Sequence, residues 1–168
     1  MKKRLISIVT PCYNEAENID ELCQRIASVM ATLPYDYEHI CIDNCSTDLT
    51  VPKIKEKALQ DKRIKLIVNA RNFGHIRSPY YGLLQSNGDA TVLLASDLQD
   101  PPEIITEFIA KWEQGYKTVL AVKPESEESS IMFGFRKVYY RLIAQISEVP
   151  LVQNATGAGL FDRVVIDV

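Results

Sequence analysis

Residues 90–103, ATVLLASDLQDPPE, carry the strongest structural signal in the chain. The first six, ATVLLA, are apolar, partly β-branched and few in number, which predicts a buried strand. Apolar residues then recur at helical spacing, at Ile104, Ile105, Phe108, Ile109 and Trp112. Asp97 is therefore expected in the turn just past the carboxyl end of a strand, where open α/β sheets place their ligands.

Two acidic residues of this turn have different interpretations. Asp97 could hold a divalent cation against phosphate oxygens, because carboxylates are preferred ligands of hard cations. It could equally do no more than solvate the turn, and the turn alone does not decide between the two. Asp100 is instead expected to cap the following helix, with Pro101 at the first helical position and Glu103 completing a capping box.

The composition is that of an ordinary globular domain. The 168 residues are 46% hydrophobic and 24% charged, which is enough chain to bury a core. A net charge of −3 without a long basic run argues against a nucleic-acid partner. The apolar run after Lys2, Lys3 and Arg4 is too short for a signal peptide or a membrane span. The four cysteines lack zinc-site spacing and are expected to be free thiols of a cytoplasmic chain.

Apolar strands and amphipathic helices alternate along the sequence. Strands are predicted at residues 5–10, 40–43, 64–68, 90–95 and 118–122. Helices are predicted at 19–33, at about 50–59 and 78–86, and in the segment that ends before Gly115. Such alternation requires crossover connections, so it predicts an α/β fold with a mainly parallel sheet and helices on both faces.

The last third of the chain is less regular. Residues 123–130 are polar without periodicity, a composition that is common in mobile loops and lids. Residues 135–146 carry an apolar stripe that is expected to face the core. The sequence then stops in the apolar run 164–168 without a cap or a turn. We therefore expect residues 1–168 to form a single domain that is a fragment of a longer protein.

Polar residues follow four of the predicted strands at their carboxyl ends. Because parallel strands end at the same edge of a sheet, these residues should surround one crevice. They are Pro11, Tyr13, Asn14, Glu15, Asp43, Asn44, Asp48, Asn69, Arg71, Asn72, Gly74, His75, Asp97 and Gln99. An aromatic ring, carboxylates, an arginine and a histidine together suit a nucleotide, although each residue alone could be a cap, a turn or a surface residue. The absence of Walker, GxGxxG and GxSxG motifs disfavours P-loop, NAD and serine-hydrolase chemistry.

Five segments, in this order, resemble family 2 glycosyltransferases: residues 9–15 (VTPCYNE), 42–48 (IDNCSTD), 71–75 (RNFGH), 96–103 (SDLQDPPE) and 156–163 (TGAGLFDR). Within that family the chain is most similar to the polyprenyl-phosphate sugar transferases of the dolichol-phosphate mannose synthase type. The resemblance implies a GT-A fold, a Rossmann-like nucleotide-diphospho-sugar transferase architecture. It also implies a nucleotide-diphospho-sugar donor, a divalent cation (Mg²⁺ or Mn²⁺) and inversion at the anomeric carbon.

The resemblance further implies the acceptor and the cellular location. The acceptor would be a lipid phosphate, of the polyprenyl type in this branch, or a glycan. Many members of the branch carry carboxyl-terminal membrane helices. The full-length protein is therefore expected at the cytoplasmic face of a membrane.

Carried over by position, the resemblance assigns roles to single residues. The donor would be bound by Pro11, Tyr13, Glu15, Asp43, Arg71, Gly74 and Ser96. Asp97, with help from Gln99, would hold the metal under the diphosphate and so act in catalysis. Asp162 would orient or deprotonate the acceptor, while an Asp before an Arg can equally form an ion pair or cap a helix.

Two positions depart from the family pattern. Ala95 replaces the first carboxylate of the usual Asp-Ala-Asp, and Asn44-Cys45 replaces Asp-Gly in the usual Asp-Asp-Gly-Ser. Fewer carboxylates should weaken cation binding. A non-catalytic nucleotide-sugar-binding or partner subunit is therefore an alternative. A sugar-phosphate nucleotidyltransferase is a third, disfavoured because its Gly-rich basic signature is absent after the first strand.

Overall fold

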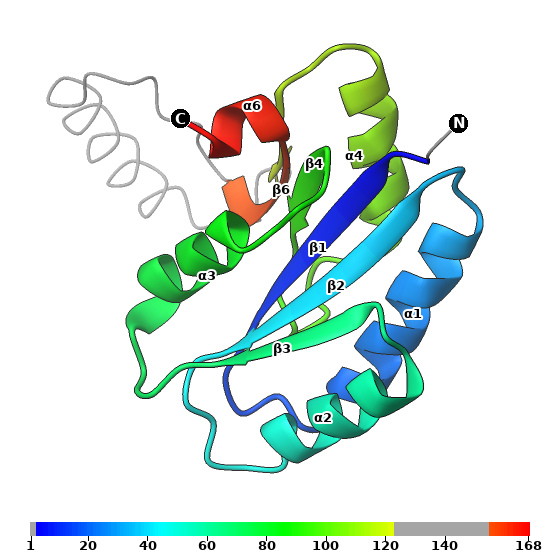
Figure 1. Ribbon diagram of the computed structural model, residues 1–168. Coiled ribbons are helices and arrows are strands. Elements are labelled where there is room, and N and C mark those ends of the chain that lie inside the picture. The colour runs from blue at the N-terminus through cyan, green and yellow to red at the C-terminus, as the bar shows by residue number, and fades with distance from the viewer. Residues whose placement is uncertain (1–2, 123–154) are drawn as a thin grey trace, which may run out of the picture.

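One mixed sheet organises the computed structural model, which describes residues 3–122 and 155–168 (Figure 1). Its strands are β1 (Leu5–Cys12), β2 (Asp36–Asp43), β3 (Ile64–Val68), β4 (Ala90–Leu93), β5 (Thr118–Val122) and β6 (Ala155–Asp162). Their order across the sheet is β3-β2-β1-β4-β6-β5. The pairs among β1, β2, β3 and β4 are parallel, and β6 is antiparallel to both β4 and β5. The predicted mainly parallel α/β sheet is confirmed, and β6 is an additional strand.

Helices cover both faces of this sheet. They are α1 (Ile19–Ala31), α2 (Thr50–Gln60), α3 (Gly74–Leu84), α4 (Ile104–Glu113) and the short α6 (Arg163–Ile166). The side chains of α1, α2 and α4 pack on one face, and α3 packs on the other (Figure 1). Strand alternation explains the division, because Ile6 and Ile8 of β1 face α1 and α4 whereas Val9 faces α3. None of the described helices is long and apolar enough to cross a bilayer.

Two elements begin earlier than the sequence pattern indicates. β2 starts at Asp36, because its first residues pair in register with β1 from Leu5 onward. α3 starts at Gly74 rather than near Ser78 and contains Pro79 in its interior. The loop before α3 is fixed by side-chain hydrogen bonds, including one from the Gly74 N–H to the Asn72 side chain at 2.8 Å. The helix therefore begins as soon as that loop ends.

The predicted capping of α4 is wrong. The residue at the N-cap position is Glu103, no side chain caps the helix, and the entry consists of tight backbone turns from Pro101 and Pro102. The Glu103 carboxylate instead pairs with the Arg25 guanidinium of α1 at 2.6 Å. A tertiary contact between two helices has replaced the local cap. The predicted loop 123–130 and helix 135–146 lie outside the described residues.

Gly88 anchors the turn between α3 and β4 to the sheet. Its N–H donates to the Ser7 hydroxyl at 2.8 Å, and its carbonyl accepts from Nε of Arg163 at 2.9 Å. A Cβ at this position would lie 2.5 Å from the Ser7 nitrogen and 2.7 Å from the Ala90 oxygen. Both are backbone atoms of the sheet, so neither can move independently. Only glycine fits here.

Asp162 lies at the edge of the sheet opposite to the carboxyl ends of the parallel strands, since it pairs with Ala90, the first residue of β4. Its Oδ2 accepts hydrogen bonds from Trp112 Nε1 at 2.6 Å and Lys117 Nζ at 3.0 Å. Its Oδ1 accepts from the Val164 N–H at 3.1 Å and so caps α6. This geometry fits the helix-cap interpretation. It argues against a role of Asp162 on the acceptor, because every oxygen is engaged far from the crevice side.

We predict that Gly88→Ala lowers the free energy of unfolding by about 2 kcal/mol or more, because the new methyl group overlaps sheet backbone. Gly115→Ala is the control: its Cβ meets nothing within 4 Å, but its φ of +100° makes it strained. We expect the control to cost only about 1 kcal/mol. Urea unfolding followed by circular dichroism measures both, and equal losses would contradict the steric argument.

Asp162 should contribute to stability in a pH-dependent way. Burial raises the pKa of Asp162, but hydrogen bonds from Trp112, Lys117 and the Val164 N–H outweigh it and hold that pKa below its usual value. A lowered folded-state pKa gives stability that is complete above the unfolded-state pKa, about 4, and is lost as the pH falls through the folded-state pKa.

We therefore expect Asp162→Asn to lower the free energy of unfolding by about 1–2 kcal/mol at pH 7. The variant should also lose less stability than the wild type when the pH falls below 4. Denaturant unfolding at pH 7 and pH 3 tests both effects. Asp36→Asn, at the exposed start of β2, is the matched control and should change neither. An unchanged acid dependence in Asp162→Asn would refute the assignment.

Candidate functional site

A cavity of about 400 Å³ opens at the carboxyl ends of β1, β2 and β4, against the start of α3. Most residues that the sequence assigned to the donor meet here. The lining consists of Pro11, Cys12, Tyr13, Glu15, Asn44, Asn72, Gly74, His75, Ser78, Pro79, Ala95, Ser96 and Asp97. Glu15 and Asp97 are its acidic residues, and His75 is the one lining side chain that can be cationic. The tyrosine ring is 49% exposed and available for stacking.

The loops after β1 and β2 hold each other in place. Asn14 has a left-handed φ of 57°, and its side-chain oxygen accepts from the Thr47 N–H at 2.9 Å. The Glu15 N–H donates to the Thr50 hydroxyl at 2.8 Å, which fixes the backbone next to the cavity. The Ser96 hydroxyl similarly donates to the Pro11 carbonyl at 3.0 Å and joins the loop after β4 to that after β1.

Asn44, one of the departures from the family pattern, connects β2 to the loop before α3. Its Nδ2 donates to the Asn72 side chain at 2.8 Å, and its Oδ1 accepts from the Phe73 N–H at 2.8 Å. A carboxylate could accept but could not donate, so the amide alone satisfies both partners. From the sequence alone, Asn44 was interpreted only as the loss of a negative charge. Its position at the end of a strand and its amide side chain are the sequence signals that could have indicated this positioning role.

Asp43 is fully buried at the end of β2, beside the cavity-lining residues Cys12 and Asn44. Its Oδ2 accepts hydrogen bonds from the N–H groups of Cys45 and Ser46, both at 3.0 Å. Cys45 adopts a φ of 69° to close this turn. Oδ1 is buried and has no hydrogen-bond partner among the described residues. An unsatisfied buried acceptor costs about 1–3 kcal/mol, so this atom needs an explanation.

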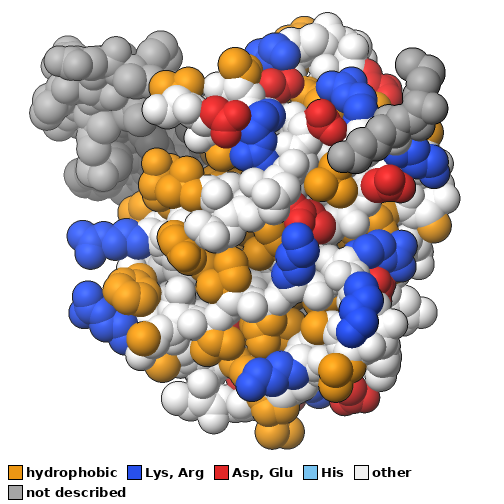
Figure 2. All heavy atoms as spheres, viewed as in Figure 1, with side chains coloured by type: hydrophobic (Ala, Val, Ile, Leu, Met, Phe, Trp, Pro, Cys, Tyr) orange, Lys and Arg blue, Asp and Glu red, His pale blue; other side chains and the backbone are white. Residues whose placement is uncertain are grey.

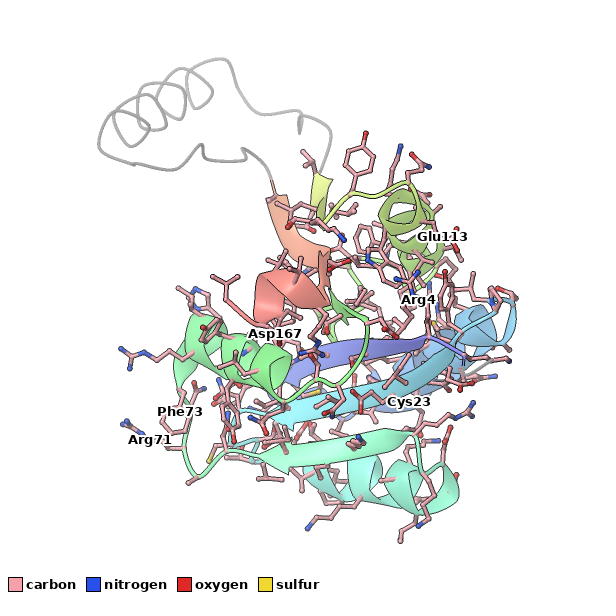
Figure 3. The ribbon with its side chains drawn as sticks, turned by 45° about the horizontal axis from the view of Figure 1, so that its top comes forward. Arg4, Cys23, Arg71, Phe73, Glu113 and Asp167 are labelled. Atoms are coloured by element: carbon pink, nitrogen blue, oxygen red, sulfur yellow. The ribbon has the colours of Figure 1, made fainter. Side chains whose placement is uncertain are left out.

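Arg71 does not line the cavity. Its guanidinium lies over the ring of Phe73, 4.7 Å from the ring centroid, and both side chains project from the loop before α3 (Figure 3). Figure 2 shows hydrophobic side chains gathered near α3, with basic side chains projecting beside them at the left of the view. Arg71 would have to change rotamer to reach a donor.

The predicted metal ligands are only partly assembled. Asp97 is exposed and lines the cavity, and its Oδ1 accepts from the backbone N–H of Gln99 at 3.1 Å. The Gln99 side chain is exposed and does not line the cavity. Leu98, between them, has a φ of 58° that shapes the turn. Within residues 3–122 and 155–168, no group of three or more His, Cys, Asp or Glu side chains has the geometry to hold a metal ion.

The chain is similar in sequence to known glycosyltransferases. The chain is 36% identical over 165 residues to an uncharacterized glycosyltransferase, YkcC, of Bacillus subtilis, covering 96% of this chain and 50% of that protein. It is 32% identical over 158 residues to an undecaprenyl-phosphate 4-deoxy-4-formamido-L-arabinose transferase of Pseudomonas fluorescens, covering 94% of this chain and 44% of that protein. The chain thus spans about half the length of the curated relatives it matches.

A solved structure shares the fold. Glucosyl-3-phosphoglycerate synthase of Mycobacterium tuberculosis, in complex with Mn²⁺, UDP-glucose and phosphoglyceric acid, matches with a TM-score of 0.66 and 21% identity, over 96% of this chain and 57% of that one. The fold is therefore of the GT-A type. The family model of glycosyl transferase family 2 matches residues 7–161, which include every strand end that lines the cavity. The chain belongs to glycosyltransferase family 2.

Proposed function

We propose that this domain binds a nucleotide-diphospho-sugar in the cavity and transfers the sugar, with inversion, to a lipid phosphate of the polyprenyl type. Asp43 Oδ1 has no hydrogen-bond partner among residues 3–122 and 155–168, and this observation carries the proposal, because a buried acceptor beside the cavity calls for an N–H donor from a ligand. Relatives named as undecaprenyl-phosphate sugar transferases support the acceptor class. Their substrates also support action at the cytoplasmic face of a membrane by the full-length protein.

Base recognition follows from Asp43 Oδ1, because a carboxylate oxygen accepts hydrogen bonds and cannot donate them. Uracil, thymine and guanine each carry a ring N–H that can donate to a carboxylate, whereas cytosine has a bare ring nitrogen at the corresponding place. The exposed Tyr13 ring can stack on the base, and Pro11 and Glu15 complete the same side of the cavity. A donor with an N–H-bearing base should therefore be preferred.

The diphosphate would lie toward Asp97 and Ser96, across the cavity from the base. A single exposed carboxylate fits Mg²⁺ or Mn²⁺ if the donor phosphates supply further ligands, as they commonly do for Mg²⁺. When bound, the cation would neutralise charge on the leaving diphosphate. Asp97 would orient it, and Gln99 keeps the Asp97 carboxylate in place through its backbone N–H.

The acceptor step needs little from the described residues. A phosphate oxygen of the lipid is already anionic, so it can attack the anomeric carbon without a general base while the nucleoside diphosphate leaves. This agrees with the engagement of Asp162 in a helix cap at the far edge. A glycan hydroxyl would require a base.

The non-catalytic alternative rests on Ala95, which lines the cavity where the family has a carboxylate. Donor binding without either transfer or donor hydrolysis would favour it over the enzyme.

We expect UDP, dTDP and GDP to stabilise the domain more than CDP in thermal unfolding with Mn²⁺. A nucleotide at 100 times its Kd should add about 2.7 kcal/mol. Asp43→Asn replaces the free carboxylate oxygen by an amide group. We expect this substitution to raise the Kd of the preferred nucleotide at least tenfold. Equal stabilisation by CDP, or unchanged affinity in Asp43→Asn, would contradict the proposed base contact.

Metal binding should depend on the nucleotide. Calorimetry should show weak Mn²⁺ binding to the free protein, because Asp97 is the single predicted metal ligand that lines the cavity, and tighter binding with UDP present. Asp97→Asn should abolish the Mn²⁺-dependent gain in UDP affinity and any transfer, yet retain metal-free UDP binding. Asp100→Asn, in the same turn but outside the cavity lining, is the control. Tight Mn²⁺ binding without nucleotide would refute the weak-site prediction.

A further inference from the structure

Three cysteines and one histidine meet in the core, on the sheet face that α1 and α2 cover. Cys12 lies on β1, His39 and Cys41 lie on β2, and Cys23 lies on α1. His39 Nε2 is 3.6 Å from Cys41 Sγ and 3.0 Å from the Thr10 hydroxyl, and His39 Nδ1 is 4.0 Å from Cys23 Sγ. The proposed sugar transfer uses none of these side chains for chemistry.

The two thiols next to His39 are electrostatically unlike. A hydrogen bond from the Cys41 thiol lowers the pKa of Cys23 well below its usual value, with further help from His39 and Lys57 and against the effect of burial. Hydrogen bonds to Cys12 and Cys23, together with burial, raise the pKa of Cys41. Cys23 is therefore the more readily ionised of the two thiols.

Groups from two neighbouring elements act on the pKa of Cys23: Cys41 and His39 from β2, and Lys57 from α2. Cys12 of β1 acts on Cys41, and Cys23 in turn acts on Tyr37 of β2. Lys57 itself is paired with Asp20 at 2.7 Å. A metal centre does not explain the cluster, because the described residues have no group of such side chains with metal-binding geometry.

Burial distinguishes the two cysteines in the order needed for oxidation. Cys23 keeps 7% of its surface exposed, and Cys41 keeps 0%. A small oxidant therefore reaches Cys23 first. Since Cys12 and Cys41 pack with Cys23 in one cluster, the product of that reaction has thiol neighbours rather than water.

We propose that Cys23 and Cys41 form a dithiol that hydrogen peroxide oxidises to a disulfide between α1 and β2. The Cys23 thiolate attacks one peroxide oxygen, the O–O bond breaks, and hydroxide leaves and takes up the proton that the thiol had released. Cys23 is then a sulfenic acid. Cys41 sulfur attacks Cys23 sulfur, the S–O bond breaks, and the oxygen leaves as water with the Cys41 proton. One peroxide oxidises two thiols and yields two waters.

The candidate site borders the cluster that contains this dithiol. Cys12, which packs in the same cluster, also lines the cavity. The oxidation itself does not depend on the proposed sugar transfer, so either can fail without the other.

Peptide mapping by mass spectrometry tests the proposal on the unaltered 168-residue chain. After mild peroxide treatment we expect a loss of 2 Da and a Cys23–Cys41 cross-linked peptide, reversed by dithiothreitol. In Cys41→Ala, Cys23 should instead accumulate as a sulfenic acid that a 1,3-dione reagent traps. Cys45→Ser is the control, because it removes the more exposed thiol and should leave the cross-link unchanged. A Cys12–Cys41 bond, or oxidation of Cys45 with Cys23 intact, would overturn the proposal.

The pH dependence of the Cys23 oxidation rate is a second readout, because it distinguishes a readily ionised thiol from an ordinary one. An ordinary thiol of pKa about 8.5 is roughly 80-fold less ionised at pH 6 than at pH 8. Glutathione in the same buffers should show that fall in oxidation rate, whereas the Cys23 rate should change less than about threefold. A Cys23 rate that falls in parallel with glutathione would refute the thiolate assignment.

Discussion

The parallel pairing of β1 with β2 on one side and β4 on the other is the constraint on which the site depends. The register sets Cys12 beside Asp43 and Val9 beside Leu93, so the three strands end together. Residues that are far apart in sequence, such as Tyr13 and Asp97, then line one cavity. No local interaction could achieve this. The packing of Ile6 and Ile8 against α1 and α4 fixes the face of β1 and thereby the register.

Loop side chains convert that common edge into a defined cavity. Asn44 donates to one loop partner and accepts from another, which a carboxylate at the same place could not do. Asn44, where the family has an aspartate, therefore removes a negative charge and adds a hydrogen bond that holds the loop before α3. Asp43 shows the complementary case, because its turn satisfies one carboxylate oxygen while the other has no hydrogen-bond partner among the described residues. Under the proposed function, Asn44 holds the loops in place and Asp43 contacts the nucleotide.

Elements with a strong local sequence signal agree with the structure, and elements that depend on distant contacts do not. The strand 64–68 and the strand 118–122 were predicted with their observed bounds, because short apolar runs between turn residues are local signals. The prediction of a capping box at α4 failed because the Glu103 side chain forms an ion pair with Arg25 of α1, a residue that is distant in the sequence. β6 was not predicted, since its glycine-rich strand has no β-typical pattern and forms by pairing between β4 and β5.

The sequence by itself determined the α/β class, the order of most elements and the set of residues at the carboxyl edge, because periodicity and strand-end position are properties of the local chain. Tertiary structure decided which members of that set line the cavity. It turned Arg71 onto Phe73 and committed Asp162 to Trp112, Lys117 and the α6 cap. It also brought Cys23 of α1 to His39 of β2. Side-chain direction and long-range pairing arise only when the helices pack on the sheet, so no local pattern could encode them.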